Sequence, residues 1–179
     1  MDATYWLAAG TPPRLPDGRP LFFGPVTPAS RPLIERAMTR LSPETSRRRF
    51  FTVRYRLSDR ELDELTILDG VDRYGIGVST IGADGQPEGV GVARYVRDAT
   101  DRNAAELALL VVDAYQGRGV GKTLLARLAR VAMARGIERF RGLVLIENVP
   151  MLRLLRQFAP NLALSRIDDY FRVDVALPG

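Results

Sequence analysis

The segment VVDAYQGRGVGKTLL, residues 111–125, has the composition of a loop that binds phosphate. Gly117, Gly119 and Gly121 leave the backbone bare, so phosphate oxygens can approach its amide groups closely. A helix that begins directly after such a loop offers unpaired N–H groups and the positive end of its dipole to an anion. Arg118 adds a positive charge beside them. These residues predict a phosphate site; from the glycines alone, a turn that packs a helix on a sheet is the alternative.

The letters GKT suggest a nucleotide-triphosphate loop, but Gln116 stands where that loop needs its first glycine. A non-glycine residue with positive φ is strained there by about 1 to 2 kcal/mol. About sixty residues follow the loop, too few for the parallel sheet that usually surrounds such a site. In its favour, the apolar run LVLIE ends in an acid, Glu147, as magnesium sites of this kind do. A dinucleotide fingerprint fails because Lys122 occupies its last glycine position.

Acid–base chemistry in this chain depends on few residue types, because it contains no histidine and no cysteine. That composition excludes disulfides, thiolate metal sites and cysteine nucleophiles, and we expect no metal. Glu106 is the acid inside the apolar stretch AELALLVV. Desolvation there would raise its pKa and make it a better base near neutral pH. The alternative is a glutamate at a strand edge that is solvated or paired with an arginine.

The positive charge of the chain is almost entirely arginine, because Lys122 is the single lysine and the net charge is +5. This balance favours anionic partners such as phosphates or acidic protein surfaces. Arg47, Arg48 and Arg49, with further arginines at 54 and 56, form the densest cluster. It is interpreted as a solvated face, or as a surface beside a site that attracts acidic protein. Aromatic residues interleave with the cluster, but nucleic acid is not favoured without repeated aromatic platforms.

The length of 179 residues suits a single domain. Seven of the twelve prolines fall within the first 32 residues, which predicts an extended or mobile leader over residues 1–20 and one domain over 21–179. No apolar run approaches the roughly 18 residues that span a bilayer, and the first residues lack the basic region of a signal peptide. We therefore expect a soluble, cytoplasmic protein.

Periodicity, capping and turn residues predict the order of the elements. We expect a short strand at 21–26, helices at 32–40, 42–49 and 58–70, a hairpin of strands 74–81 and 89–97, and a strongly apolar strand at 104–112. A helix at 120–135, a strand at 140–146, a helix at 151–158 and a strand pair at 162–167 and 170–177 follow. In this order, the strand at 104–112 leads directly into the glycine loop, and the helix at 120–135 follows it. The predicted phosphate site therefore lies between a strand and a helix.

A series of segments in this order resembles the GNAT superfamily of N-acetyltransferases, and within it the bacterial protein-lysine acetyltransferases that modify acyl-CoA synthetases. The segments are LSPETSRRRFF, LDGVDR, GVARYVR, AELALLVVDAYQGRGVG and ENVPMLRLLR. The resemblance implies an α/β (α+β) GNAT fold, whose mixed, mostly antiparallel sheet is splayed between its fourth and fifth strands and flanked by helices. It also implies acetyl-CoA as co-substrate and a primary amine as acceptor, with a protein lysine favoured.

The resemblance also assigns roles to individual residues. The strand before the loop would pair its backbone with the pantetheine arm, and the loop amides would hold the pyrophosphate. Glu106 would deprotonate the amine, and a backbone N–H near Val111 would meet the oxyanion. The cofactor-binding set implied in this way is Leu109, Leu110, Val111, Gln116, Gly117, Arg118, Gly119, Val120, Gly121, Lys122 and Asn148.

One departure from the family concerns the general acid. Many of these enzymes carry a tyrosine seven residues after the asparagine, and that position is Leu155 here. The usual Gly-Phe ending of the same helix is Ala159-Pro160. A thiolate with a pKa near about 8.5 can take its proton from solvent, so the general acid is left unassigned. A fold that binds acyl-CoA as a sensor or interaction module, without turnover, is the second hypothesis. We expect control by cyclic nucleotide or amino acid to be absent or supplied by another chain, and the oligomeric state stays open.

Overall fold

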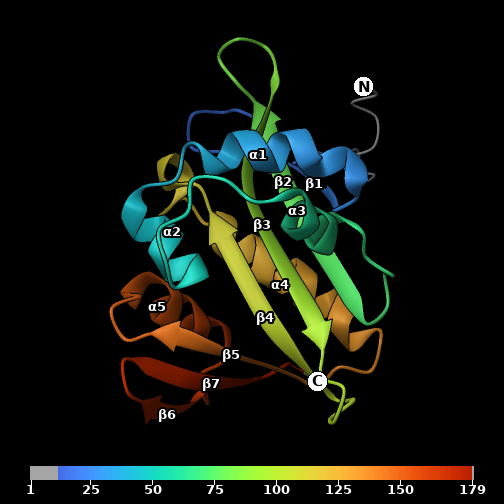
Figure 1. Ribbon diagram of the computed structural model, residues 1–179, viewed down its shortest axis with the longest axis vertical. Coiled ribbons are helices and arrows are strands. Elements are labelled where there is room, and N and C mark those ends of the chain that lie inside the picture. Colours follow the sequence, from blue (N-terminus) through green and yellow to red (C-terminus); the bar gives the residue numbers. More distant parts are fainter. Residues whose placement is uncertain (1–11, 179) are drawn as a thin grey trace.

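The computed structural model describes residues 12–178, which form one mixed sheet with helices packed on it (Figure 1). The strands are β1 (Phe22–Pro25), β2 (Arg73–Ile81), β3 (Pro87–Arg97), β4 (Ala104–Val111), β5 (Arg139–Leu145), β6 (Ala163–Ile167) and β7 (Tyr170–Ala176). The helices are α1 (Arg31–Met38), α2 (Pro43–Phe50), α3 (Asp59–Thr66), α4 (Val120–Met133) and α5 (Val149–Phe158), with 3₁₀ turns at Pro28–Ser30 and Asp113–Tyr115. The predicted order of elements is confirmed, although α3 ends earlier than expected.

The seven strands follow the order β1-β2-β3-β4-β5-β7-β6. Every neighbouring pair is antiparallel except β4 and β5, which are parallel. In Figure 1, α1, α2 and α3 lie in front of the sheet and α4 lies behind it. This is the predicted mixed, mostly antiparallel α/β fold flanked by helices.

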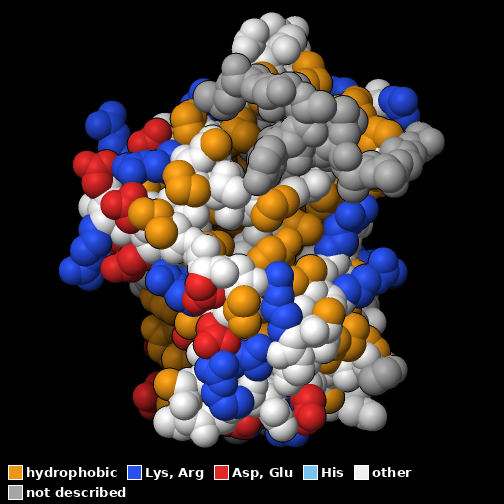
Figure 2. All heavy atoms as spheres, turned by 90° about the vertical axis from the view of Figure 1, so that its right-hand side faces the viewer, with side chains coloured by type: hydrophobic (Ala, Val, Ile, Leu, Met, Phe, Trp, Pro, Cys, Tyr) orange, Lys and Arg blue, Asp and Glu red, His pale blue; other side chains and the backbone are white. Residues whose placement is uncertain are grey.

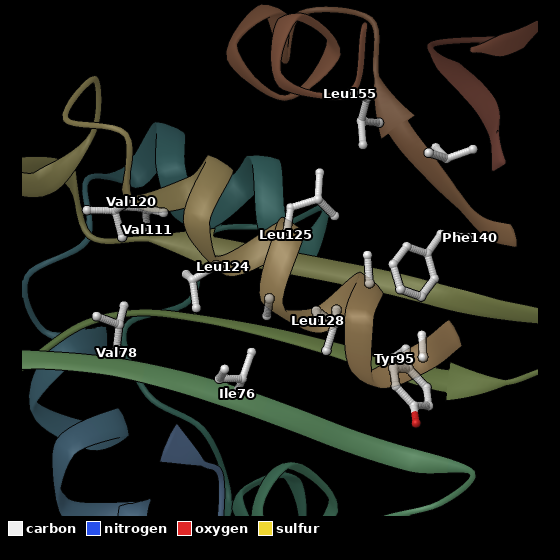
Figure 3. Packing of buried hydrophobic residues seen from close by; sticks show 14 of the residues in the cluster. Ile76, Val78, Tyr95, Val111, Val120, Leu124, Leu125, Leu128, Phe140 and Leu155 are labelled. Carbon is white, nitrogen blue, oxygen red and sulfur yellow. The ribbon is translucent and has the colours of Figure 1, made fainter. Parts of the chain in front are cut away.

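Helix α4 fixes the sheet from behind through one apolar face. Leu124, Leu125 and Leu128 recur at helical spacing and are fully buried. In Figure 3, Leu124 and Leu128 point toward the sheet residues Val78 and Ile76, whereas Leu125 points toward Leu155. Burying such leucines stabilises the fold by roughly 1.5 to 3 kcal/mol each. The helix start is therefore held rigidly against the sheet.

Helix α2 begins and ends in defined ways that set its direction. Ser42 accepts a hydrogen bond from Thr45 N–H at 3.1 Å through its hydroxyl, and Pro43 occupies the first turn, as predicted. The helix ends at Phe51, whose φ of 60° is left-handed although the residue is not glycine. This sharp ending turns the chain away shortly after Arg48 and Arg49, which both line the cavities beside β4.

The predicted splay of the sheet is found between β4 and β5. The two strands share three paired positions, from Ala104 opposite Arg139 to Glu106 opposite Arg141. Beyond Glu106 they diverge, and α2 and α5 border the opening. The second half of β4 thus has one strand edge paired with β3 and the other edge open.

The predicted leader needs a correction over residues 12–20. Leu15 is buried in the core, and its N–H donates to Arg19 C=O at 2.8 Å in a tight turn. An isolated β-bridge joins Arg14 and Pro20. The prediction of an extended or mobile segment is therefore wrong for this part, because an apolar side chain anchors it; residues 1–11 lie outside the described range. Within the described chain, no helix combines the length and apolarity needed to cross a membrane.

Candidate active site

Two cavities meet where β4 and β5 separate. The first, of about 650 Å³, lies between the end of β4, the glycine loop and the start of α5. The second, of about 490 Å³, lies between the start of β4, β5, β7 and the end of α2. The residues that line both cavities are Arg48, Arg49, Leu109, Asn148 and Met151. This shared lining marks the junction at which a group in one cavity can reach a group in the other.

The glycine loop forms one wall of the first cavity. Gly117 and Gly119 have φ values of 71° and 80°, a region that side-chain-bearing residues rarely adopt. Thr123 N–H donates to Gly119 C=O, whereas no N–H from residues 117–122 donates a hydrogen bond within the described chain. These amides stand at the N-terminus of the 14-residue helix α4, so they suit an anion. The predicted phosphate cradle is therefore present as geometry.

Three members of the predicted loop set contribute in different ways. The Val120 side chain is 1% exposed and belongs to the core, so this residue offers its amide alone. Lys122 is exposed and lines the first cavity. A Cβ on Gly121 would lie 3.4 Å from Leu154, which is ordinary contact, so the glycine keeps the space in front of α5 open.

The Arg118 side chain forms an ion pair outside the glycine loop. Its guanidinium lies 3.5 Å from the carboxylate of Asp17, which also pairs with Arg19 at 2.8 Å. The pKa of Asp17 is lowered, first by the side-chain hydrogen bond from Arg19. All three side chains are exposed by a third or more. The predicted phosphate contact of Arg118 therefore competes with a surface ion pair in this structure.

Gln116 braces the loop through its side chain. Its Nε2 donates to Val111 C=O at 3.0 Å and to Thr45 Oγ1 at 3.1 Å. The residue also lines the first cavity, at the start of the glycine loop. These hydrogen bonds tie the loop to both β4 and α2, and they give a reason for an amide where a nucleotide-triphosphate loop has glycine.

Asp113 strengthens the same connection and was missed by sequence reasoning. Its carboxylate accepts from Ser42 N–H at 3.0 Å, Ser42 Oγ–H at 2.6 Å and Thr45 Oγ1–H at 2.8 Å. Burial acts to raise the pKa of Asp113, but these hydrogen bonds outweigh it and the pKa is lowered. The partners are about seventy residues apart in the chain, so no local pattern could have revealed them.

The open edge of β4 offers backbone groups to the first cavity. Val112 N–H donates to Val90 C=O on β3, and antiparallel pairing alternates. Leu110 therefore directs its backbone groups to β3, while Leu109 and Val111 direct theirs to the opening. The side chains of all three residues help to line the first cavity. A ligand with amide groups can pair with this edge as an added strand would.

Glu106 lines the second cavity at the last paired position of β4. The residue is exposed, so the predicted desolvation of its carboxyl is wrong, because the strand opens at this point. Its β3 partner is Val96, and Arg94 two residues earlier projects from the same face. Burial lowers the pKa of Arg94, as does Arg73, while Glu106 opposes the change. Within the described chain Glu106 makes no hydrogen bond or ion pair, so its carboxylate is available to a ligand.

Asn148 stands at the junction as predicted. Its Oδ1 accepts a hydrogen bond from Met151 N–H at 3.2 Å and caps α5. Leu155, at the position of the tyrosine found in many GNAT enzymes, is fully buried and lines neither cavity. Figure 3 shows it in the core facing α4. A substrate in the junction is therefore not in contact with residue 155.

The arginines at the end of α2 differ in whether they form ion pairs. Arg47 pairs with Glu147 at 2.9 Å, and Arg48 pairs with Glu44. Among the described residues Arg49 makes no ion pair or hydrogen bond and lies over the ring of Phe50 at 4.9 Å. Arg54 likewise pairs with Glu61. In Figure 2, basic side chains on the lower half of the visible face also lie beside acidic ones.

A mixed sheet that opens at a parallel strand pair, with an anion cradle on one side and a carboxylate on the other, defines the GNAT class of acyltransferase. In agreement, the sequence profile of the acetyltransferase (GNAT) family matches residues 40–159. The chain belongs to this family and is a GNAT-type N-acetyltransferase.

Individual relatives narrow the comparison. Acetyltransferase Pat of Mycolicibacterium smegmatis is 33% identical over 147 residues, which cover 80% of this chain and 42% of Pat. The chain thus spans less than half the length of that relative. The crystal structure of the GNAT domain of S. lividans PAT is 31% identical, covers 99% of both chains and has a TM-score of 0.80. The structure of the Salmonella typhimurium acetyltransferase yncA, solved with its cofactor acetyl-CoA, is 15% identical to this chain. The match covers 88% of this chain and 94% of the yncA chain. With a TM-score of 0.65 it shows the fold alone.

Proposed function

We propose that this chain transfers an acetyl or other short acyl group from acetyl-CoA to a primary amine, and that the favoured acceptor is a protein lysine. The observation that carries the proposal is the meeting of two cavities at the open edge of β4, with a phosphate cradle at one end and Glu106 at the other. One cavity takes the acyl donor and the other takes the amine.

The donor fits the first cavity through three kinds of contact. The amides of residues 117–122 hold the pyrophosphate, with the positive end of the α4 dipole behind them. The open backbone groups of Leu109 and the N–H of Val111 pair with the amide-containing pantetheine arm, while the Val111 C=O already accepts from Gln116. Asn148 borders the thioester from the start of α5. Yet the loop alone fits any pyrophosphate, so it is the strand edge that favours acyl-CoA.

The amine approaches from the second cavity and must lose a proton before it attacks. Glu106 takes this proton directly or through water, because it is the carboxylate in that cavity without a protein partner. The new N–C bond forms as the carbonyl becomes tetrahedral, and an N–H of Leu109 or Val111 stabilises the oxyanion. The C–S bond then breaks, CoA leaves with the electron pair on sulfur, and the nitrogen gives its second proton to water as the amide forms.

A protein lysine is favoured as acceptor because similar proteins named Pat and PAT span 80% and 99% of this chain. The second cavity is also bordered by exposed residues on α2 and β7, among them Phe51 and Arg172, which a protein surface could contact. Arg141 lies deeper in this cavity and pairs with Asp174 at 3.0 Å.

The decisive measurement is the release of CoA thiol with acetyl-CoA and a panel of amines and proteins. The chain has no cysteine, so a thiol reagent reports CoA alone. Glu106→Gln should lower kcat by about 10²- to 10⁴-fold with little change in acetyl-CoA affinity. Glu35→Gln, at an exposed position on α1 outside both cavities, is the matched control.

Each alternative has its own signature in the same experiments. Full activity in Glu106→Gln would remove this residue from the mechanism. Tight acetyl-CoA binding without turnover on any acceptor would support the non-catalytic binding module, which the buried Leu155 and the Ala159-Pro160 ending favour. Thermal stabilisation by Mg-ATP and not by acetyl-CoA would overturn the assignment of the loop to CoA.

A further inference from the structure

An arginine with no role in the proposed reaction so far contributes a positive charge at the junction of the two cavities. Arg49 lies in the last turn of α2, is half-buried and lines both cavities. Within residues 12–178 it has no hydrogen-bond or ion-pair partner, unlike Arg47 and Arg48 beside it. A partly buried guanidinium without a partner is costly, so an anion placed here would be stabilised.

The other residues of the junction do not offer such a charge. Leu109 and Met151 have no side-chain N–H or O–H. Asn148 is neutral and caps α5 with its oxygen. The charge of Arg48 is paired with Glu44 through Nη2, although its buried Nε has no hydrogen-bond partner among the described residues. Leu155 is buried away from both cavities. Arg49 is thus the one unpaired cation among the described residues that line both cavities.

The surroundings of Arg49 support this assignment. Burial, together with the nearby positive charge of Arg94, lowers its pKa to about 10, and Glu106 acts in the opposite direction. The guanidinium therefore keeps its proton at neutral pH but lacks the negative charge that would balance it. A negative charge that develops in the junction during the reaction can supply that balance.

The geometry points to Arg49 as the residue that stabilises the thiolate of CoA while it leaves, a task performed by a protonating tyrosine in many GNAT enzymes. This inference rests on the proposed acyl transfer. The amine that Glu106 has deprotonated forms its bond to the carbonyl carbon, and the nitrogen gives its second proton to water as the amide forms. The C–S bond breaks and its electron pair stays on sulfur next to the Arg49 cation. The thiolate takes its proton from water after it has left.

The first test measures the pKa of the thiol of bound CoA. Because the chain has no cysteine, the ultraviolet absorbance of the thiolate reports the CoA sulfur, with desulfo-CoA as the blank. An adjacent cation should hold this pKa about 1 to 3 units below that of CoA in solution, which is a tenfold or greater gain in thiolate at a fixed pH. Arg49→Met should abolish the shift, and Arg49→Lys should keep part of it.

Arg172→Met is the matched control for the titration. Arg172 is another arginine without an ion pair among the described residues, but it lines the second cavity alone. This variant should leave the thiol pKa of bound CoA where the wild type has it. Loss of the shift in Arg48→Met and not in Arg49→Met would overturn the proposal, as would equal pKa values in wild type and Arg49→Met.

The second test separates catalysis from folding. Arg49→Met should lower kcat by about tenfold for each pKa unit lost, with an unchanged Kd for acetyl-CoA and an unchanged thermal unfolding midpoint. If Arg49→Met unfolds, Arg49→Lys is compared with the wild type instead, and its thiol pKa for bound CoA should lie between that of the wild type and that of free CoA. If CoA does not bind to the wild type at all, the acyl-transfer proposal itself fails; binding without a thiol shift overturns the role of Arg49 alone.

Discussion

The two cavities of this molecule are built on different principles. The first offers backbone groups to a ligand: glycine amides, an open strand edge and a helix N-terminus, with the loop tied in place by hydrogen bonds that Gln116 donates and Asp113 accepts. The second carries charged side chains of both signs, contributed by α2, β3, β4, β5 and β7. Backbone groups that bind the phosphates of the donor do not distinguish the rest of the ligand, whereas side chains in the second cavity can select an acceptor. The contrast suggests that donor binding resists substitution of surface side chains and that acceptor choice changes readily.

The difference also explains where charge is left unpaired. The Asp113 carboxylate, which lies behind the first cavity and connects the loop to α2, accepts all of its hydrogen bonds from the protein itself. At the junction and in the second cavity, Arg49 and Glu106 have no such partner within the described chain. Unpaired charges of opposite sign near one another suit a reaction in which a proton moves one way and an electron pair moves the other.

The largest effect on the first cavity is expected from Gly119→Ala. A side chain at φ 80° is strained by about 1 to 2 kcal/mol, and it tilts the amides that face the anion. Losing one hydrogen bond to a charged group costs about 1.5 to 3 kcal/mol, so the Kd for acetyl-CoA should rise roughly ten- to a hundredfold by calorimetry.

Gly85→Ala is the control for this strain. Gly85 has φ 76° in the turn between β2 and β3, with no atom within 4 Å of an added Cβ, as at Gly119. Both variants should lose similar stability in urea, and Gly119→Ala alone should lose affinity. Equal affinities in the two variants would mean that the loop amides do not hold the donor.

The connection between α2 and the glycine loop gives the next prediction. Asp113→Ala leaves the donors of Ser42 and Thr45 without an acceptor, which should lower the free energy of unfolding by about 1 to 3 kcal/mol in urea. Donor affinity should fall a few-fold, because the brace of the loop is lost. Asp69→Ala removes a comparable carboxylate, one that accepts from three backbone N–H groups after α3, far from the cavities. It should lose stability and keep its affinity.

The same carboxylate predicts a dependence on pH. The pKa of Asp113 in the folded chain lies below its ordinary value of 3.8. Its contribution to stability is therefore fully present above that value and is lost as pH falls through the lower, folded pKa. The stability difference between wild type and Asp113→Asn, measured by urea unfolding, should be constant from pH 5 to 7 and shrink below about pH 4. A difference that persists at low pH would contradict the brace.

The first cavity could be predicted from the sequence far better than the second. Glycine spacing, the strand before it and the helix after it are local, and they gave the loop and the start of α4 correctly. The resemblance supplied the splay and the place of Asn148. Glu106 was placed correctly but its burial was not, because an apolar stretch does not reveal that its neighbour strand diverges. Arg49 looked like part of a solvated cluster, since the partners of its neighbours decide which arginine stays unpaired, and the partner of Arg47 is Glu147, about a hundred residues away.

The smallest effect is expected from the ion pair between Asp17 and Arg118, which lies at the edge of the first cavity. Asp17 holds Arg118 at 3.5 Å across the loop, and both side chains are exposed, so this pair contributes about 1 kcal/mol or less. Asp17→Asn should release the guanidinium toward the pyrophosphate and lower the Kd for acetyl-CoA by a few-fold at low salt. The gain should disappear as ionic strength rises, because exposed charges are screened. In Asp17→Asn combined with Arg118→Gln the gain should vanish at any salt. A gain that survives there would place the effect in the packing of residues 12–20 instead of in the competition for Arg118.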